Sequence, residues 1–141
     1  MGTSLVVDVT HTFDEYLKKD EILVVKFYSK MCGSCKEFAP IWTEFTTATP
    51  SIHSFGEVDI DTAEGMQLAQ EMGVLEEGIP NVRVVNTKKR SLLKRTPSIY
   101  DGSGTTQPTT TDLSRALKKI LVKHEVNEAG AFSKRRKTGA V

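Results

Sequence analysis

Two cysteines, Cys32 and Cys35, are the residues of this sequence best suited to carry out chemistry. They are the only cysteines among the 141 residues, and Gly33 and Ser34 separate them. A disulfide between them would close a loop of two residues. Because so short a loop constrains the unfolded chain very little, a structural disulfide is the weaker interpretation. The spacing instead favours thiol–disulfide exchange or metal binding.

The segments on either side of the pair place it between a strand and a helix. Residues 22–28 form a nearly continuous apolar run that is rich in β-formers, which is typical of a central strand buried on both faces. Residues 36–45 have helical spacing, with Phe38, Ile41, Trp42 and Phe45 on one side. The cysteines are therefore predicted to lie where a strand leads into a helix.

The start of a helix suits the first cysteine to nucleophilic attack. The unpaired amides and the positive end of the helix dipole favour the thiolate of Cys32, and only a thiolate attacks a disulfide. Cys35 lies one turn along the helix, close enough to attack the resulting mixed disulfide and release the reduced substrate. We predict that Cys32 is the nucleophile and Cys35 the resolving thiol.

Two alternatives to exchange chemistry stay open for the pair. A zinc site needs four ligands, and His11, His53 and His124 are scattered without the spacing of a histidine pair, so we predict no metal and place the histidines at the surface. The cysteines can also lie near a helix start by coincidence, with no chemical role.

The remaining segments extend the alternation of strands and helices. Strands are predicted over residues 4–9, 51–60 and 81–85, and residues 91–100 can supply a last strand. Helices are predicted from Thr10 or Thr12 through Leu17, over residues 62–72 with Met66 among the apolar positions, and around Leu113, Leu117, Ile120 and Leu121 after a cap at Thr111 or Asp112. The order up to residue 85 is βαβαβαβ.

Composition and charge exclude several classes of protein. Hydrophobic residues make up 38% and charged residues 26% of the chain, and no run approaches the ~20 apolar residues of a membrane span. The net charge of the whole chain is +1. The last fourteen residues carry +3, so residues 1–127 carry −2. A mildly acidic domain lacks the basic surface with which proteins bind nucleic acid. We therefore predict neither a membrane protein nor a nucleic-acid-binding protein.

The N-terminus lacks a basic region followed by an apolar one, so no secretory signal is visible. We expect a cytoplasmic protein as the chain stands, and the lumen of the endoplasmic reticulum or another secretory compartment if the chain is a domain of a longer protein.

The segment VKFYSKMCGSCKEFAP, residues 25–40, resembles the active-site segment of thioredoxins and especially of the thioredoxin domains of protein disulfide isomerases. Tyr28 and the run Ala39-Pro40-Ile41-Trp42 favour the isomerase branch. VDID (residues 58–61) resembles the family's third strand, LAQEMGV (68–74) the end of the following helix, and GIP (78–80) its cis-proline loop. The resemblance covers about residues 4–124.

This resemblance implies an α/β thioredoxin fold, with three layers α/β/α around a central mixed sheet. The domain would span residues 1–124, and residues 125–141 would form a basic, disordered tail. It also implies a cis-proline at Pro80 that faces the cysteines, where the backbone of Ile79 would pair with an extended substrate segment. Met31, Gly33 and Ser34 would complete the contact with substrate.

Three features depart from the family pattern. Met31 replaces the usual tryptophan and gives a softer contact surface. Lys26 stands where the family places a buried carboxylate beneath the resolving cysteine. Its charge would help to stabilise a nearby thiolate, or its stem would lie along the strand while its amine reaches water. About two extra residues precede the cis-proline loop, and Glu76 and Glu77 there would disfavour acidic substrates or simply be solvated.

The sequence thus predicts a thiol–disulfide oxidoreductase of the protein disulfide reductase or isomerase type, working through the Cys-Gly-Ser-Cys dithiol. No metal or organic cofactor is expected, because the electrons pass through the cysteine pair. The expected partners are protein disulfides or dithiols and an external electron donor or acceptor, and the chain is expected to be a monomer. The alternative is an interaction module or adaptor of the same fold with little redox turnover, which Lys26 and Met31 favour and the retention of both cysteines disfavours.

Overall fold

A mixed sheet of five strands carries the segment that contains the cysteines. The computed structural model describes residues 6–19, 21–52, 54–126 and 132–134. The sheet contains β1 (Val6–Asp8), β2 (Leu23–Tyr28), β3 (Ser54–Asp59), β4 (Asn81–Val85) and β5 (Ser98–Tyr100), in the spatial order β1-β3-β2-β4-β5. β1, β3 and β2 are parallel, whereas β4 runs antiparallel to both β2 and β5. The predicted central strand, β2, therefore lies in the middle of the sheet.

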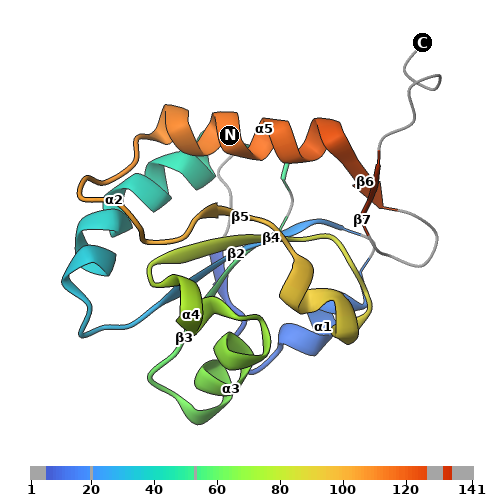
Figure 1. Cartoon of the computed structure of the whole chain (residues 1–141), viewed down its shortest axis with the longest axis horizontal. Helices are drawn as coiled ribbons and strands as arrows, with labels where there is room; N and C mark the ends of the chain where they lie inside the picture. The colour runs from blue at the N-terminus through green and yellow to red at the C-terminus, as the bar shows by residue number, and fades with distance from the viewer. Residues whose placement is uncertain (1–5, 20, 53, 127–131, 135–141) are drawn as a thin grey trace.

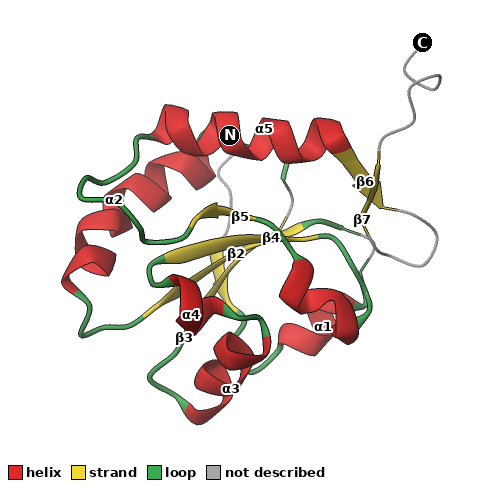
Figure 2. Cartoon of the chain, viewed as in Figure 1, coloured by secondary structure: helices red, strands yellow, loops and turns green. Residues whose placement is uncertain are grey.

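Helices cover both faces of this sheet, which completes the predicted three layers (Figures 1 and 2). The long helices α2 (Gly33–Thr47) and α5 (Thr110–Lys123) lie together on one face. The other face carries α1 (Phe13–Leu17), α3 (Ala63–Glu71), α4 (Val74–Glu77) and the short 3-10 helix η1 (Arg90–Arg95). The thioredoxin-type architecture expected from the sequence is confirmed.

Alternating side chains of β2 feed two separate hydrophobic clusters, as the twofold period of a strand requires. Val24 packs beneath α2 and α5 with Phe38, Trp42, Phe45 and Leu113. Val25 and Phe27 pack on the other face with Phe13, Leu68, Met72 and Leu93. β2 is thereby held from both sides, and the position of its last residue, which leads to the cysteines, is fixed by the core.

The side chains that cap the helices differ from the predicted ones. The Thr109 hydroxyl accepts the Asp112 N–H at 3.0 Å while the Asp112 carboxylate accepts the Thr109 N–H at 2.9 Å, so α5 begins two or three residues earlier than a cap at Thr111 or Asp112 would place it. Neither threonine predicted before α1 caps that helix through its side chain within the described residues. Thr10 instead accepts the backbone N–H of Asp59 at 3.0 Å.

The prediction of a strand over residues 91–100 was wrong for its first half. Residues Arg90–Arg95 form η1, because Leu93 is fully buried in the core and the Thr96 hydroxyl donates to its carbonyl at 2.6 Å. Pro97 follows, and the residue before a proline is confined to extended backbone, so the helix ends and β5 begins at Ser98.

The buried face of α3 also differs from the predicted one, since Met66 is 36% exposed rather than buried. Gly65 occupies the buried position, where a Cβ would lie 1.9 Å from the Asp59 carbonyl oxygen. α3 therefore packs against the end of β3 with no room for a side chain.

After α5, β6 (His124–Val126) pairs antiparallel with β7 (Phe132–Lys134). The rest of the predicted tail over residues 125–141 lies outside the described residues. None of the helices in the described ranges is long and apolar enough to cross a membrane.

Candidate active site

Cys32 and Cys35 lie together at the N-terminus of α2, as predicted. Cys32 is the N-cap residue with extended backbone (φ −96°, ψ 117°), and its Sγ accepts the backbone N–H of Cys35 at 3.1 Å. The helix begins at Gly33, three residues before the predicted start, because the cysteine sulfur itself satisfies an amide of the first turn. Cys32 is partly exposed, whereas Cys35 is 5% exposed, and both are free thiols.

Burial gives Cys35 a distinct chemical character. Loss of solvation raises the pKa of its thiol from 9.0 to about 12, and its hydrogen bond with Cys32 adds to the rise. A hydrogen bond from the Ser29 backbone and the positive charge of Lys26 act in the opposite direction. Cys35 is therefore a protonated thiol at neutral pH, which leaves Cys32 as the accessible nucleophile.

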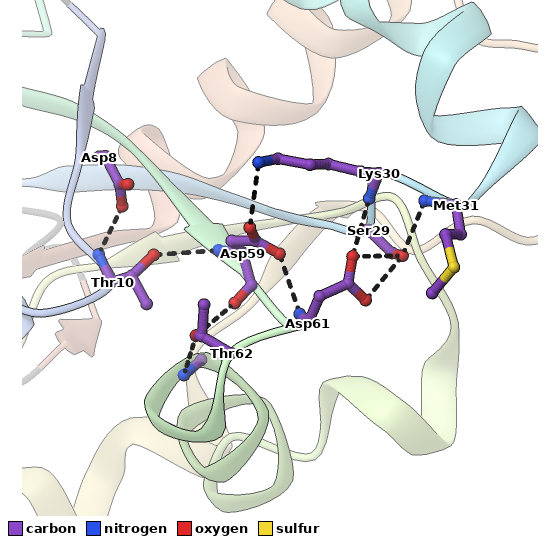
Figure 3. A network of polar contacts seen from close by, with 9 residues as sticks. Asp8, Thr10, Ser29, Lys30, Met31, Asp59, Asp61 and Thr62 are labelled. Atoms are coloured by element: carbon purple, nitrogen blue, oxygen red, sulfur yellow. Dashed lines mark hydrogen bonds and ion pairs between the residues drawn. The ribbon is translucent and has the colours of Figure 1, made fainter.

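The loop before Cys32 is held by a single carboxylate, that of Asp61 (Figure 3). The Ser29 hydroxyl donates to both oxygens of Asp61, at 2.9 and 3.0 Å, and the Lys30 N–H donates to Oδ2 at 3.1 Å. The same hydroxyl accepts the Met31 N–H at 3.1 Å, and the Ser29 carbonyl accepts the Cys32 N–H at 3.2 Å. Asp61 thus fixes the approach of the chain to the nucleophile, a role that sequence reasoning missed.

Asp61 is itself held by the end of β3. The Asp59 carboxylate accepts the Asp61 N–H at 2.9 Å and lies 3.9 Å from the Lys30 ammonium. The Thr62 hydroxyl donates to the Asp59 carbonyl at 2.9 Å and also caps α3. The loops that follow β2 and β3 are consequently one hydrogen-bonded unit.

Lys26 is buried beneath the dithiol, and the alternative in which its amine reaches water was wrong. Its side chain is 7% exposed, its Nζ lies 3.4 Å from Oε2 of Glu57, and the rings of Tyr28 and Trp42 lie 5.2 and 5.5 Å from it. Glu57 is the residue opposite Lys26 in the register of β2 and β3, and its Oε2 also accepts the Trp42 indole N–H at 2.9 Å. A carboxylate is therefore present beneath the site, but on the neighbouring strand.

Replacing Lys26 with Met is expected to slow alkylation of Cys35 by about threefold or more at a fixed alkaline pH. The lysine charge favours the Cys35 thiolate, so its removal raises the pKa of that thiol further and lowers the thiolate fraction. The measurement is the pH profile of iodoacetamide reaction at Cys35 in a Cys32→Ala background. Lys118→Met, on the exposed side of α5, serves as control. An unchanged profile would remove Lys26 from the chemistry of the site.

The loop before β4 contains a cis peptide bond between Ile79 and Pro80, as expected from the sequence. Pro80 is buried and Ile79 is partly exposed. At Gly102, with φ +78°, a Cβ would lie 2.9 Å from the Ile79 carbonyl oxygen, so the segment after β5 packs directly on the cis-proline loop. That segment is a second wall of the site that sequence reasoning did not identify.

The extra residues before this loop form the short helix α4, and a buried arginine anchors it. Oε1 of Glu77 accepts the Asn81 side-chain amide at 3.0 Å and lies 3.2 Å from the Arg83 guanidinium, whose side chain is 2% exposed. Glu77 is thus directed toward the protein, which argues against its predicted role in repelling acidic substrates. Glu76 is exposed.

The other predicted contact residues lie at the surface around Cys32. Met31 is 84% exposed, and Gly33 and Ser34 are exposed. Gln107, in the segment between β5 and α5, donates to the Ser34 carbonyl at 3.3 Å. Within the described ranges, no group of three histidine, cysteine or acidic side chains is arranged to hold a metal ion.

Tyr100 is a further residue near the cysteines that the sequence did not reveal. Its ring stacks on Phe38 at 5.1 Å, and its pKa is raised by burial, by the charge of Asp101 and by the two cysteines. It reaches the site from β5, so no local sequence signal marks it.

The sequence of this chain is similar to those of known proteins. The family model described as Thioredoxin matches residues 4–107. Human protein disulfide-isomerase A6 is 25% identical over 119 residues, which cover 84% of this chain and 25% of that protein. The putative thioredoxin 2 of Streptomyces coelicolor is 31% identical over 83 residues, 59% of this chain and 58% of its relative.

A solved structure shares the fold. Thioredoxin f2, crystallised in complex with ferredoxin:thioredoxin reductase, is 22% identical with a TM-score of 0.57, covering 84% of this chain and 94% of that one. The chain spans about a quarter of the isomerase and just over half of the Streptomyces protein.

Proposed function

This chain belongs to the thioredoxin family, and from that premise we propose that it is a thiol–disulfide oxidoreductase of the protein disulfide reductase or isomerase type. The observation that carries the proposal is the pairing at the start of α2. A partly exposed Cys32 accepts an amide of the first helical turn, and a buried Cys35, with its pKa raised to about 12, lies directly behind it.

The two cysteines have different roles in the proposed reaction. Cys32 attacks a substrate disulfide, because a sulfur at a helix N-terminus is placed where negative charge is favourable. The Cys32–substrate disulfide forms and one substrate thiolate leaves. Cys35 then loses its proton and attacks Cys32, which breaks the Cys32–substrate bond, forms the Cys32–Cys35 disulfide and leaves the second substrate sulfur to take up a proton. Two electrons pass from the protein to the substrate, and the same steps run in reverse when the protein oxidises a dithiol.

Substrate would lie across the surface formed by Met31, Gly33, Ser34 and the cis-proline loop. An extended segment would pair with the backbone of Ile79 beside Pro80, as in the addition of a strand to an edge. Met31 would contribute an adaptable apolar contact.

The proposed partners are protein disulfides or dithiols and an external electron donor or acceptor. Thioredoxin f2 is crystallised with ferredoxin:thioredoxin reductase, which supports a reductase as one class of partner. The similarity to human protein disulfide-isomerase A6 supports the isomerase type of oxidoreductase. We also propose that the protein is located in the cytoplasm, or in a secretory compartment if the chain is a domain of a longer protein.

The test is partial alkylation of the reduced protein followed by mass spectrometry. At neutral pH we expect Cys32 to react at least about 100-fold faster than Cys35, because a pKa near 12 leaves very little Cys35 thiolate. Mixing with excess disulfide should then convert both thiols into one intramolecular disulfide. Equal reaction of the two cysteines, with no internal disulfide, would contradict the proposal and favour an interaction module.

A further inference from the structure

The short segment between α4 and β4 contains Ile79, whose backbone is the proposed contact with substrate (Figure 1). In the described part of the chain, neither the N–H nor the carbonyl of Ile79 makes a hydrogen bond, and the residue is partly exposed. Both groups are therefore available to an extended segment of another chain. Such pairing costs least when the backbone already has the right orientation before the partner binds.

Glycines lie next to the Ile79 backbone on two sides. Gly78 precedes it with φ +122°, a conformation that residues with a side chain rarely adopt. Gly102 packs against the Ile79 peptide through its backbone alone, because there is no room for a Cβ. The Ile79 side chain itself packs against the core, which holds the residue at one point. The backbone that leads into Ile79 therefore depends on hydrogen bonds for its conformation.

Asn81, the first residue of β4, supplies those hydrogen bonds. Its side-chain amide donates to Oε1 of Glu77 at 3.0 Å and to the Gly78 carbonyl at 3.1 Å, so both amide hydrogens are used. No other donor reaches the Gly78 carbonyl among the residues that the structure describes. The Asn81 side chain is fully buried, and its backbone pairs with Phe27 of the central strand. Asn81 thus ties the two residues before Ile79 to the sheet.

The carboxylate that accepts from Asn81 is also fixed from below. Oε1 of Glu77 lies 3.2 Å from the guanidinium of Arg83, which follows Asn81 by two residues and so lies on the same face of β4. Oδ1 of Asn81 has no hydrogen-bond partner within the described residues, so the side chain acts through its N–H groups. The loop from Glu77 to Asn81 is therefore closed at both ends by one amide group.

We propose that Asn81 is a positioning residue for substrate, which holds the Ile79 backbone in the orientation that pairs with an extended segment beside the substrate disulfide. The inference rests on the proposed oxidoreductase function and names disulfides within extended polypeptide segments as the substrates that the loop favours. A small disulfide has no backbone to pair, so Asn81 should not affect it. Since the loop is ordered before binding, loss of Asn81 should weaken peptide binding rather than slow the exchange step.

The experiment compares two mixed disulfides that have the same leaving group, the coloured thiol thionitrobenzoate. In one it is joined to the central cysteine of a short extended peptide, and in the other to 2-mercaptoethanol. Each is mixed with the reduced protein over a range of concentrations, and release of thionitrobenzoate is followed. For Asn81→Ala we expect the half-saturating concentration of the peptide to rise by about fivefold to tenfold, with little change in the limiting rate. The rate with the small disulfide should equal that of the native chain.

Two controls separate positioning from stability. Asn86→Ala removes another buried asparagine just after the opposite end of β4, and it should leave the half-saturating concentration of the peptide unchanged. A peptide that is N-methylated at the backbone amides beside its cysteine cannot complete the pairing. The native chain should bind this peptide about as weakly as Asn81→Ala binds the ordinary one, and Asn81→Ala should weaken its binding no further.

The possible outcomes distinguish this inference from the proposed function. If Asn81→Ala does not fold, Asn81→Ser, which keeps a polar side chain but lacks the two N–H donors, should show the same shift. An unchanged half-saturating concentration for the peptide in a folded Asn81 variant, or equal slowing of both disulfides, would overturn the positioning role alone. Failure of both disulfides to oxidise the cysteine pair of the native chain would overturn the proposed function together with this inference.

Discussion

Cys35→Ser is expected to stop the reaction with the substrate still joined to Cys32. The attacking residue is partly exposed and unaffected by the substitution, so the first disulfide still forms. The second step then lacks the neighbouring thiol at the first turn of α2. Release must wait for an external thiol, and the lifetime of the mixed disulfide should lengthen by about 10³-fold or more, because an oriented intramolecular group acts at a very high effective concentration.

The adduct can be detected by non-reducing electrophoresis and mass spectrometry after mixing with a protein disulfide such as insulin. Cys32→Ser provides the control, since it removes the attacking sulfur and should yield no adduct. If Cys35→Ser released substrate as fast as the native chain, the assignment of Cys35 as the resolving thiol would fail.

Glu77→Ala is expected to destabilise the fold by about 2–3 kcal/mol, the largest effect on stability that we predict outside the core. The Arg83 guanidinium is almost fully buried, and its remaining bonds go to the carbonyl and hydroxyl of Thr96 at 3.2 and 3.1 Å. Removing the carboxylate leaves a buried positive charge without a counter-ion. We place the loss below the range of about 3–5 kcal/mol for fully buried pairs because the Glu77 side chain is 40% exposed.

Urea denaturation of the native chain and three variants tests this expectation. Arg83→Met in the Glu77→Ala background should recover most of the lost stability, since an apolar side chain of similar length needs no counter-ion. Glu76→Ala, at the exposed neighbouring position, should change stability by less than about 0.5 kcal/mol. A Glu77→Ala variant as stable as Glu76→Ala would show that the ion pair contributes little.

The features that could be predicted from the sequence are those with a local cause. The apolar run of β2 and the helical spacing after it place Cys32 at a strand-to-helix junction, and the order of elements up to β4 follows the same patterns apart from the additional helix α4. The cis bond at Pro80 is predicted through resemblance, because the residues around it match a known loop.

The features that were missed depend on which strands are neighbours. Glu57 lies 31 positions after Lys26 in the chain, and only the parallel register of β2 and β3 brings them opposite each other. Asp61 reaches Ser29 for the same reason, since the two strands end side by side. Arg83 lies between two valines in β4, and nothing in a strand pattern shows that an acidic residue of α4 will neutralise it. Pairings across a sheet have no signature in one sequence taken alone.

The amide that Cys35 donates to Cys32 also links the stability of the fold to the redox potential of the pair. A thiolate accepts such a hydrogen bond well, whereas a sulfur within a disulfide carries no charge and accepts it weakly. Whenever Cys32 is a thiolate, the contact therefore stabilises the reduced chain more than the oxidised one. In a closed thermodynamic cycle that difference must reappear as an easier reduction of the disulfide, at about 30 mV for every 1.4 kcal/mol in a two-electron couple. The N-cap of α2 thus shifts the pair toward the oxidising end of its range.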